Sequence, residues 1–251
     1  MSLLWRNKKL RIGLAPDRIY ITGAKSMELA ANDGSWNAPV EALAAALAGR
    51  KGGQAALVLA DQFVRYALLP HNEALKTPEQ WQALATHRFS ALHGPRAAEW
   101  QVHVTETAPK GPRIACAVDR ALITRLAEVF TAAGLHLASV QPFLVAAFNR
   151  IRKSVGNGSC WIVVEEPGRL TLALLQRGVW VAIRGRRVEK GWRHVLPEIL
   201  ERESAFLGLS DPVTRVIICA QGQVDTAHFS QMYEAWRTEA LGYRELALAG
   251  E

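Results

Sequence analysis

The chain has 251 residues, of which 49% are hydrophobic and 21% charged, and this composition excludes a disordered chain and allows one large or two modest domains. No run of 18 uncharged apolar residues occurs and residues 1–9 lack the apolar core of a secretory signal, so we expect a cytosolic protein without a membrane span. Lys and Arg exceed Asp and Glu by 30 to 23, which permits attraction to nucleic acid, anionic lipid or an acidic partner but selects none of them.

The first segments predict a strand meander, a helix and a further apolar stretch. In chain order they are strands at residues 10–14, 18–22 and 26–30, a helix at 37–48, and a hairpin or one long bent strand at 55–69. Ala15, Pro16 and Asp17 supply the turn between the first two strands. Val40 and Leu43 begin the apolar face of the helix.

A helix with a strong start signal follows. Thr77 is a predicted N-cap, Pro78 occupies the first turn and Gln80 stands at the capping-box position. Its expected apolar face consists of Trp81, Leu84, Phe89 and Leu92. The next segments, in order, are strands at 99–105 and 113–118, a helix from Asp119 to Gly134, a strand at 136–140, a helix at 142–152 and a linker at 154–159.

A second meander opens the other half of the chain. Its predicted strands are residues 160–164, 169–175 and 179–184, separated by turns at 165–168 and 176–178. The first of them lacks strict alternation, so we expect a central strand that is covered on both faces. The remaining predictions are a helix at 191–207 with Trp192, Val195, Ile199 and Phe206 on its apolar face, a strand at 214–220, a helix at 225–239 and a strand at 243–248.

The two halves repeat one order of elements. Each has three strands, a helix, and then strands and helices in alternation, which is the ribonuclease H-like βββαβαβ unit of actin-like folds. We therefore predict an α/β protein of two lobes. The N-terminal lobe comprises residues 1–153 with an insert subdomain at about 63–107, and the C-terminal lobe comprises residues 159–251.

Three stretches resemble a known family. They are LVLADQFVRYALLP, TPEQWQALATHRF and IACAVDRALITRLAEVFTAAGLHLASVQPF, and together with the later meander they are similar to the PilM/GspL family. This family comprises actin-like cytoplasmic components of type IV pilus, including MSHA-type pilus, and type II secretion assembly platforms. The resemblance spans nearly the whole chain and implies a protein peripheral to the inner membrane. It further implies an adaptor that grips the N-terminal tail of a membrane-anchored partner and could dock an assembly ATPase.

ATP binding in this fold needs glycines that let backbone amides approach phosphate, and an acidic residue for Mg²⁺. ATP-binding members of the fold carry Asp-x-Gly in the first hairpin. Here Ala15 occupies the position of the aspartate, Pro16 has no amide hydrogen to donate, and Asp17 occupies the position of the glycine. The first phosphate loop is therefore degenerate.

The second hairpin and the adenosine loop depart from the pattern as well. Glu165 and Glu166 precede Pro167-Gly168, and two carboxylates where phosphate would lie repel it. The adenosine loop, normally rich in glycine, retains only Gly222 within residues 219–223. We expect a pseudo-ATPase with no bound ATP, no metal and no catalytic residue.

The insert supplies the predicted partner site. Phe63, Arg65, Tyr66 and Trp81 are the candidates, because a peptide can dock by adding a strand or by filling aromatic pockets. Trp81 also fits an ordinary core position. The sequence predicts no nucleic-acid partner, since no recognition motif accompanies its basic residues.

Two other functions fit the sequence less well. The main alternative is an ATP-binding enzyme of the actin and sugar-kinase superfamily. A nuclease of ribonuclease H topology is disfavoured, because the strand at residues 10–14 contains no acid. The three cysteines, Cys116, Cys160 and Cys219, lie in predicted strands without CxxC spacing, which is typical of buried free thiols.

Overall fold

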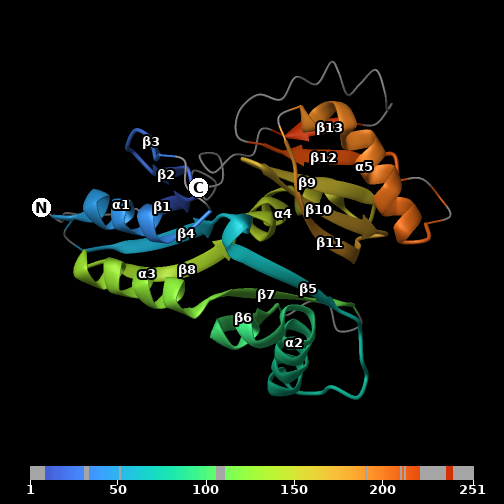
Figure 1. Ribbon diagram of the computed structural model, residues 1–251, viewed down its shortest axis with the longest axis horizontal. Helices are drawn as coiled ribbons and strands as arrows, with labels where there is room; N and C mark the ends of the chain where they lie inside the picture. Colours follow the sequence, from blue (N-terminus) through green and yellow to red (C-terminus); the bar gives the residue numbers. More distant parts are fainter. Residues whose placement is uncertain are drawn as a thin grey trace, which may run out of the picture. The chain divides into compact units, whose positions relative to one another are not determined.

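The computed structural model describes residues 9–30, 34–50, 52–105, 111–189, 191–209, 211, 213–220 and 236–239. Of residues 236–239 it describes only the backbone. These residues form two compact units, and the chain passes from one to the other between Arg150 and Ile151. Each unit is built around its own five-stranded sheet (Figure 1).

The sheet of the first unit has the strand order β3-β2-β1-β4-β8. Its strands are β1 (Leu10–Leu14), β2 (Arg18–Ile21), β3 (Met27–Glu28), β4 (Gln54–Leu59) and β8 (His136–Pro142). The meander β1–β2–β3 is antiparallel, whereas β4 pairs in parallel with β1 and with β8. The predicted first meander is therefore confirmed.

Three helices accompany this sheet: α1 (Asn37–Leu47), α3 (Arg120–Ala132) and α4 (Phe143–Val155). Val40, Leu43 and Leu47 of α1 are fully buried, as the helical spacing predicts. Asp119 caps α3 by accepting a hydrogen bond from the Ala121 amide at 2.9 Å, and Gly134 follows its end with a positive φ of 67°.

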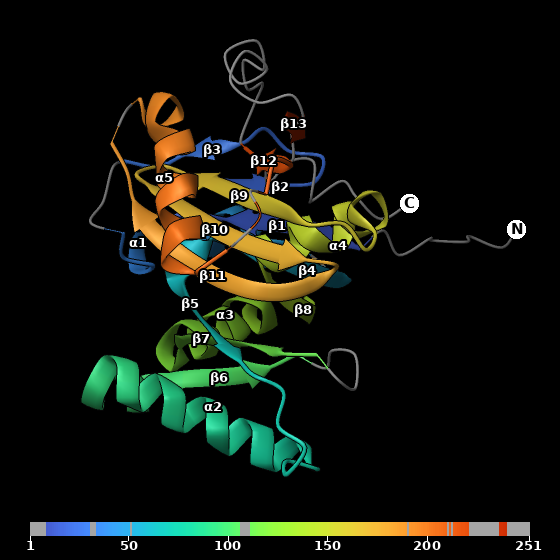
Figure 2. The same cartoon turned by 90° about the vertical axis from the view of Figure 1, so that its right-hand side faces the viewer.

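A separate three-stranded sheet with the order β5-β7-β6 forms the insert of the first unit. The insert consists of a short 3-10 helix (Asp61–Phe63), β5 (Val64–Leu69), α2 (Pro78–His93), a 3-10 helix (Gly94–Glu99), β6 (Trp100–Val104) and β7 (Arg113–Asp119). Figure 2 shows α2 lying alongside β6. The insert thus extends past the predicted boundary at about residue 107, because β7 pairs with β5 and β6 instead of joining the large sheet.

The prediction for residues 55–69 was wrong in both of its forms. Strands β4 and β5 do not pair with each other, and they belong to different sheets. The polar pair Asp61-Gln62 falls in the 3-10 helix that redirects the chain between them.

Helix α2 begins as predicted. The Thr77 hydroxyl accepts from the Gln80 amide at 3.3 Å, and the Gln80 side chain accepts from the Thr77 amide at 3.1 Å. Trp81 and Phe89 are buried, but Leu92 is 54% exposed, so its assignment to the apolar face was wrong. The small sheet is narrow, and the helix covers it with less than its full length.

The second unit repeats the large sheet, with the order β11-β10-β9-β12-β13. Its elements are β9 (Cys160–Glu166), β10 (Arg169–Gln176), β11 (Val179–Arg187), α5 (Trp192–Phe206), β12 (Val216–Cys219) and β13 (Trp236–Glu239). The second sheet has the same order of strands as the first, with β9 in the middle as predicted. The duplicated unit is confirmed.

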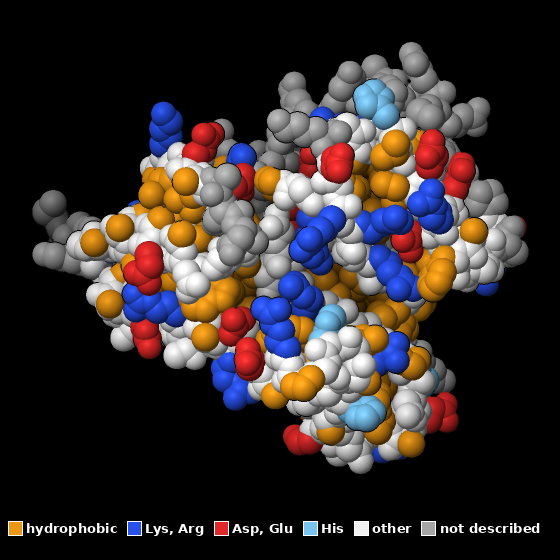
Figure 3. All heavy atoms as spheres, viewed as in Figure 1, with side chains coloured by type: hydrophobic (Ala, Val, Ile, Leu, Met, Phe, Trp, Pro, Cys, Tyr) orange, Lys and Arg blue, Asp and Glu red, His pale blue; other side chains and the backbone are white. Residues whose placement is uncertain are grey.

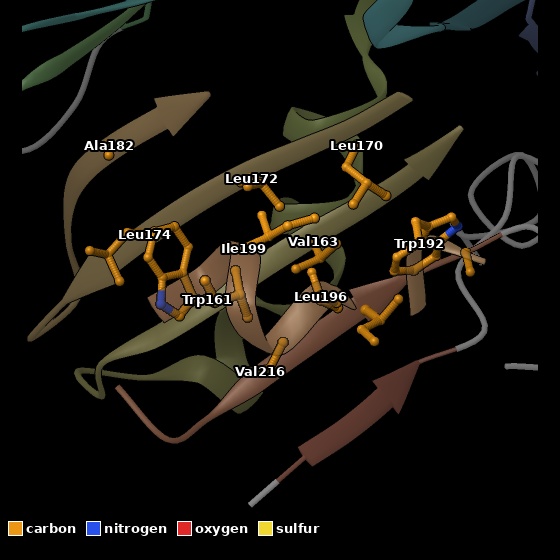
Figure 4. Close-up of a cluster of buried hydrophobic side chains, with 13 residues drawn as sticks. Trp161, Val163, Leu170, Leu172, Leu174, Ala182, Trp192, Leu196, Ile199 and Val216 are labelled. Atoms are coloured by element: carbon orange, nitrogen blue, oxygen red, sulfur yellow. The ribbon is translucent and has the colours of Figure 1, made fainter. Parts of the chain in front are cut away.

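The core of the second unit lies between its sheet and α5 (Figure 4). Trp161 is 1% exposed and shares this buried cluster with Leu196, Ile199 and Leu200 of the helix. Two residues expected on the apolar face, Val195 and Phe206, are 44% and 73% exposed. Val195 lies at the margin of the stripe formed by Trp192, Leu196, Ile199 and Leu200, whereas Phe206 is the last residue of α5.

Two further predictions need correction or lie outside the description. Residues 236–239 form strand β13, parallel to β12, where a helix was expected. The rest of that predicted helix, residues 225–235, and the strand at 243–248 lie outside the described residues.

The segment predicted as a linker is tied to the second unit. Helix α4 extends to Val155, and the Arg215 guanidinium donates to the carbonyls of Ser154 and Val155 at 2.9 and 3.3 Å. The predicted lobe end at residue 153 therefore lies inside a helix. Among the described residues, no helix is both long and apolar enough to cross a membrane.

Candidate functional site

The first hairpin turn, residues 15–18, is closed by its own groups. The buried Ala15 amide donates to the Arg18 carbonyl at 3.0 Å, and Pro16 has no amide hydrogen. Arg18 forms an ion pair with the Asp17 carboxylate at 2.8 Å. The Asp17 carbonyl accepts from the Leu29 amide at 2.7 Å, which ties the turn to the chain after β3. In this turn the Ala15 amide is therefore already hydrogen-bonded, Pro16 has no amide hydrogen to donate, and the Asp17 carboxylate is paired with Arg18.

The second hairpin differs from the prediction. Glu165 and Glu166 belong to β9, and only Pro167 and Gly168 form the turn. Glu166 is 2% exposed, while Glu165 accepts from Trp192 Nε1 at 3.1 Å and from Arg193 at 2.9 Å. The prediction that both glutamates lie in the turn was wrong, because β9 extends through Glu166. Adjacent residues of a strand point to opposite faces of the sheet, so the two carboxylates do not lie side by side.

Gly168 keeps a feature that phosphate binding uses. Its φ is 72°, and a Cβ added there would meet no atom within 4 Å. The Gly168 carbonyl accepts from the Val188 amide at 3.0 Å. The second turn is therefore less obstructed than the first. Gly222 of the predicted adenosine loop lies outside the described residues.

Three of the four predicted partner residues lie where β5 begins. Phe63 is 8% exposed, and the Arg65 guanidinium donates to the carbonyls of Gln62 and Val64, both at 3.1 Å. The Tyr66 hydroxyl donates to the fully buried Asp61 carboxylate, which also accepts from the Leu144 amide at 3.1 Å. These side chains connect the insert to the start of α4.

Trp81 lies apart from those three, between α2 and the small sheet. Its ring is 3% exposed, and the Arg113 guanidinium stacks over it at 4.5 Å from the ring centre. Both line a groove of about 850 Å³ along α2, together with residues of the helix (Pro78, Glu79, Gln82, Ala83, Thr86, His87 and Ser90) and of β6 (His103 and Val104). Figure 3 shows histidine and hydrophobic side chains on the surface of the insert.

Sequence reasoning missed Arg113 and Asp61. Asp61 had a signal, since an acidic residue interrupts an apolar run there. Arg113 had none, because a single arginine at the start of a strand is ordinary, and its position depends on the pairing of β7 with β5, where it lies opposite Leu69.

The cysteines and the possible metal ligands are further candidates for a reactive or metal-binding site. Cys116, Cys160 and Cys219 are buried free thiols, as predicted. Burial, with a smaller effect of Asp61, raises the pKa of Cys116 to about 12, so that thiol stays protonated at neutral pH. The described residues contain no group of three His, Cys, Asp or Glu side chains that could hold a metal ion.

Comparisons with known proteins find similarity in structure alone. No protein-family model matches the sequence, and a search of the curated proteins finds no relative. A Bacteroides thetaiotaomicron protein with an actin-like ATPase fold and unknown function is 14% identical, with a TM-score of 0.63 over 99% of this chain and 98% of that one.

Two further solved structures are similar over most of their length. A chain of the PilM–PilN type IV pilus biogenesis complex is 11% identical, with a TM-score of 0.65 over 92% of this chain and 88% of that one. The cytoplasmic domain of EpsL, an inner-membrane component of the type II secretion system of Vibrio cholerae, is 11% identical, with a TM-score of 0.56 over 95% and 92%. At such identities the likeness establishes the fold, and this chain therefore has the actin-like ATPase fold that these pilus and secretion proteins share.

Proposed function

We propose that the chain is a non-catalytic adaptor of a type IV pilus or type II secretion assembly platform. It lies on the cytoplasmic face of the inner membrane and binds the cytoplasmic tail of a membrane-anchored partner. The fold shared with a chain of the PilM–PilN complex and with the EpsL cytoplasmic domain supports this assignment. So does the family resemblance of the sequence.

The observation that carries the non-catalytic part of the proposal is the first hairpin turn. Phosphate binding by a hairpin needs free backbone amides and small residues. Here one amide is bonded within the turn, Pro16 has none, and Asp17 adds a negative charge that Arg18 already neutralises. A triphosphate would have to break this turn before it could bind.

An adaptor of this kind works by binding alone. The ordered complex with the tail presents a composite surface to the next component of the platform, and an assembly ATPase is our candidate for that component. The free energy of assembly then comes from the interfaces, and the chain itself needs no nucleotide hydrolysis.

Calorimetric titration with synthetic tails tests the adaptor role. The tails are the N-terminal cytoplasmic segments of the inner-membrane pilus or secretion proteins of the same organism, each paired with a scrambled peptide of equal composition. We expect one tail to bind with 1:1 stoichiometry and its scrambled form not to bind. If no tail from either kind of system binds, the adaptor role is wrong.

The open space at Gly168 favours one alternative, an ATP-binding enzyme of the actin and sugar-kinase superfamily. Thermal unfolding with and without Mg-ATP distinguishes the two. Nucleotide at a hundred times its dissociation constant would add about 2.7 kcal/mol to the stability of the folded state. We expect the midpoint to stay unchanged at millimolar Mg-ATP, and a reproducible rise would favour the enzyme.

A further inference from the structure

The free edge of strand β6 borders the groove in the insert. Among the described residues, β6 pairs only with β7, so its other edge has no neighbouring strand. The groove reaches the end of this edge, with His103 and Val104 on the strand side and residues spaced along one face of α2 on the other. An unpaired strand edge presents backbone donors and acceptors that can pair with another chain.

The hydrogen-bond pattern identifies which backbone groups face the groove. The Thr105 amide donates to the Ile114 carbonyl at 2.8 Å, and bonded pairs alternate along an antiparallel ladder. The amides and carbonyls of Trp100, Val102 and Val104 therefore point away from β7. The Gln82 side chain confirms this direction, because its Nε2 donates to the Val102 carbonyl at 2.8 Å.

Side chains cap part of this edge and leave its end open. Gln82 covers the Val102 carbonyl, and Arg120 approaches the Trp100 carbonyl at 3.4 Å. Val104 lines the groove, and no described residue bonds to its outward amide or carbonyl. An incoming strand can therefore pair with Val104 directly and extend toward Val102 by displacing the Gln82 amide.

Arg113 gives the groove a preference for negative charge. Its guanidinium carbon lies over the buried Trp81 ring at 4.5 Å from the ring centre, and among the described residues it forms no ion pair. A stacked guanidinium still presents its N–H groups in its plane, where a carboxylate accepts two of them. Among the described residues that line the groove, Glu79 is the only acidic one, and the whole chain carries a net charge of +7.

We infer that the groove between α2 and β6 binds an extended, acidic segment of a partner protein. The segment adds to β6 as a fourth strand of the small sheet and places a carboxylate on Arg113. Because α2 flanks the groove, one extended chain fits there, whereas the edge of a second folded sheet would meet the helix. This inference rests on the proposed function only in that the ligand is a protein.

The probe is a library of random 12-residue peptides displayed on phage and selected on the immobilised full chain. We expect the selected peptides to alternate β-branched residues with Asp or Glu. Their affinity is then measured by fluorescence polarisation against the wild type and against variants whose folding is checked by circular dichroism.

Two matched pairs of variants locate the binding. Ala83→Trp fills the groove and Ala91→Trp places the same side chain on an exposed part of α2 outside it. We expect the first to weaken binding more than tenfold and the second to leave it unchanged. Arg113→Gln should weaken acidic peptides about tenfold, as expected for the loss of a charged hydrogen bond, and Arg96→Gln, an equal loss of charge on the same insert, should not.

N-methylation of single peptide amides tests strand addition. Methylation should abolish binding at alternate residues only, since every second amide of an added strand points at β6. Peptides that bind Ala83→Trp as well as the wild type, tolerate methylation at every position, or fail to emerge from the selection would overturn the inference. A dimer of this chain that Ala83→Trp dissociates would also overturn it, in favour of a second copy.

The outcome is separable from that of the adaptor test. Peptides that bind the groove while no platform tail binds would support the groove and contradict the proposed function. A platform tail that binds Ala83→Trp as tightly as the wild type would keep the adaptor role and contradict the groove as its site.

Discussion

The two halves of the chain build the same sheet and close its first hairpin with different chemistry. In the first half, Asp17 and Arg18 pair with each other inside the turn. In the second half, the turn is Pro167-Gly168, and Glu165 reaches from β9 to Trp192 and Arg193 on α5. Strand order is the same in both.

The difference shows that topology and ligand chemistry are set by different residues. Buried β-branched and aromatic residues fix the strand order, and few of them lie in the turns. The turns can therefore change without cost to the fold. In the first half Asp17 and Arg18 of the turn pair with each other, and in the second half Glu165 of β9 connects the sheet to the helix that covers it.

The largest expected effect comes from the core of the second half. Trp161→Ala removes a large side chain that is 1% exposed and should lower the free energy of unfolding by about 3–5 kcal/mol. Val195→Ala on the exposed side of α5 should change it by less than about 0.5 kcal/mol.

Hydrogen exchange during urea unfolding checks whether this loss stays in one half. We expect faster exchange in β9, β10 and β12 and unchanged exchange in β1 and β4. Equal losses in both halves would show that they unfold as one cooperative unit, and the two sheets could not then be treated as independent.

Alanine at the two hairpin carboxylates compares the hairpins directly. Glu165→Ala breaks hydrogen bonds of a partly buried carboxylate with Arg193 and Trp192 and should cost about 1.5–3 kcal/mol. Asp17→Ala breaks one ion pair between neighbouring residues of a surface turn and should cost about 0.2–1 kcal/mol.

Chemical denaturation measures both, with the exposed Glu189→Ala as the control for loss of a negative charge. A larger cost at Asp17 than at Glu165 would contradict the view that only the second hairpin is tied into the core.

The insert is the largest addition to the first half, and its helix cap offers a smaller effect. Thr77→Ala removes the capping box of α2 and should destabilise the insert by about 1 kcal/mol. Thr86→Ala, in the middle of the same helix, should be neutral or slightly stabilising because alanine has the higher helix propensity. Hydrogen-exchange rates of the α2 amides measure the difference. Equal rates in the two variants would show that the cap does not stabilise α2.

The smallest effect is a pH dependence carried by His93. Burial, with a smaller effect of Arg65, lowers the pKa of this imidazole below its ordinary value. Between the lowered pKa and about 6.5 the unfolded chain binds more protons than the folded one, so stability should fall as pH drops below about 6.5.

His93→Gln should remove that part of the pH dependence, measured as the change in unfolding midpoint between pH 7.5 and pH 5.5. The difference between variant and wild type at pH 7.5, where His93 is neutral in both states, gives the baseline. An unchanged pH slope in His93→Gln would assign the dependence to other groups.

Much of the candidate site could not be predicted from sequence patterns. The four residues chosen in the insert were selected as aromatic or charged residues near a predicted strand, and three of them make internal contacts at the start of β5. Trp81 does line a groove, but its neighbour Arg113 is 32 positions away and reaches it only through the pairing of β7. The carboxylates of Glu165 and Glu166 were placed in a turn, because the sequence does not mark where β9 ends.

The sequence by itself determined the order of the elements, the duplication and the cap of α2, because these depend on residues close together in the chain. Periodicity, turn residues and capping pairs act over a few positions, and they need no knowledge of what packs opposite. Only the tertiary structure decided that β4 and β5 enter different sheets, that β7 belongs to the insert, and that a groove opens along β6. Those features depend on which strands pair across long separations in the sequence. A run of β-branched residues predicts a strand but does not indicate which other strand it pairs with.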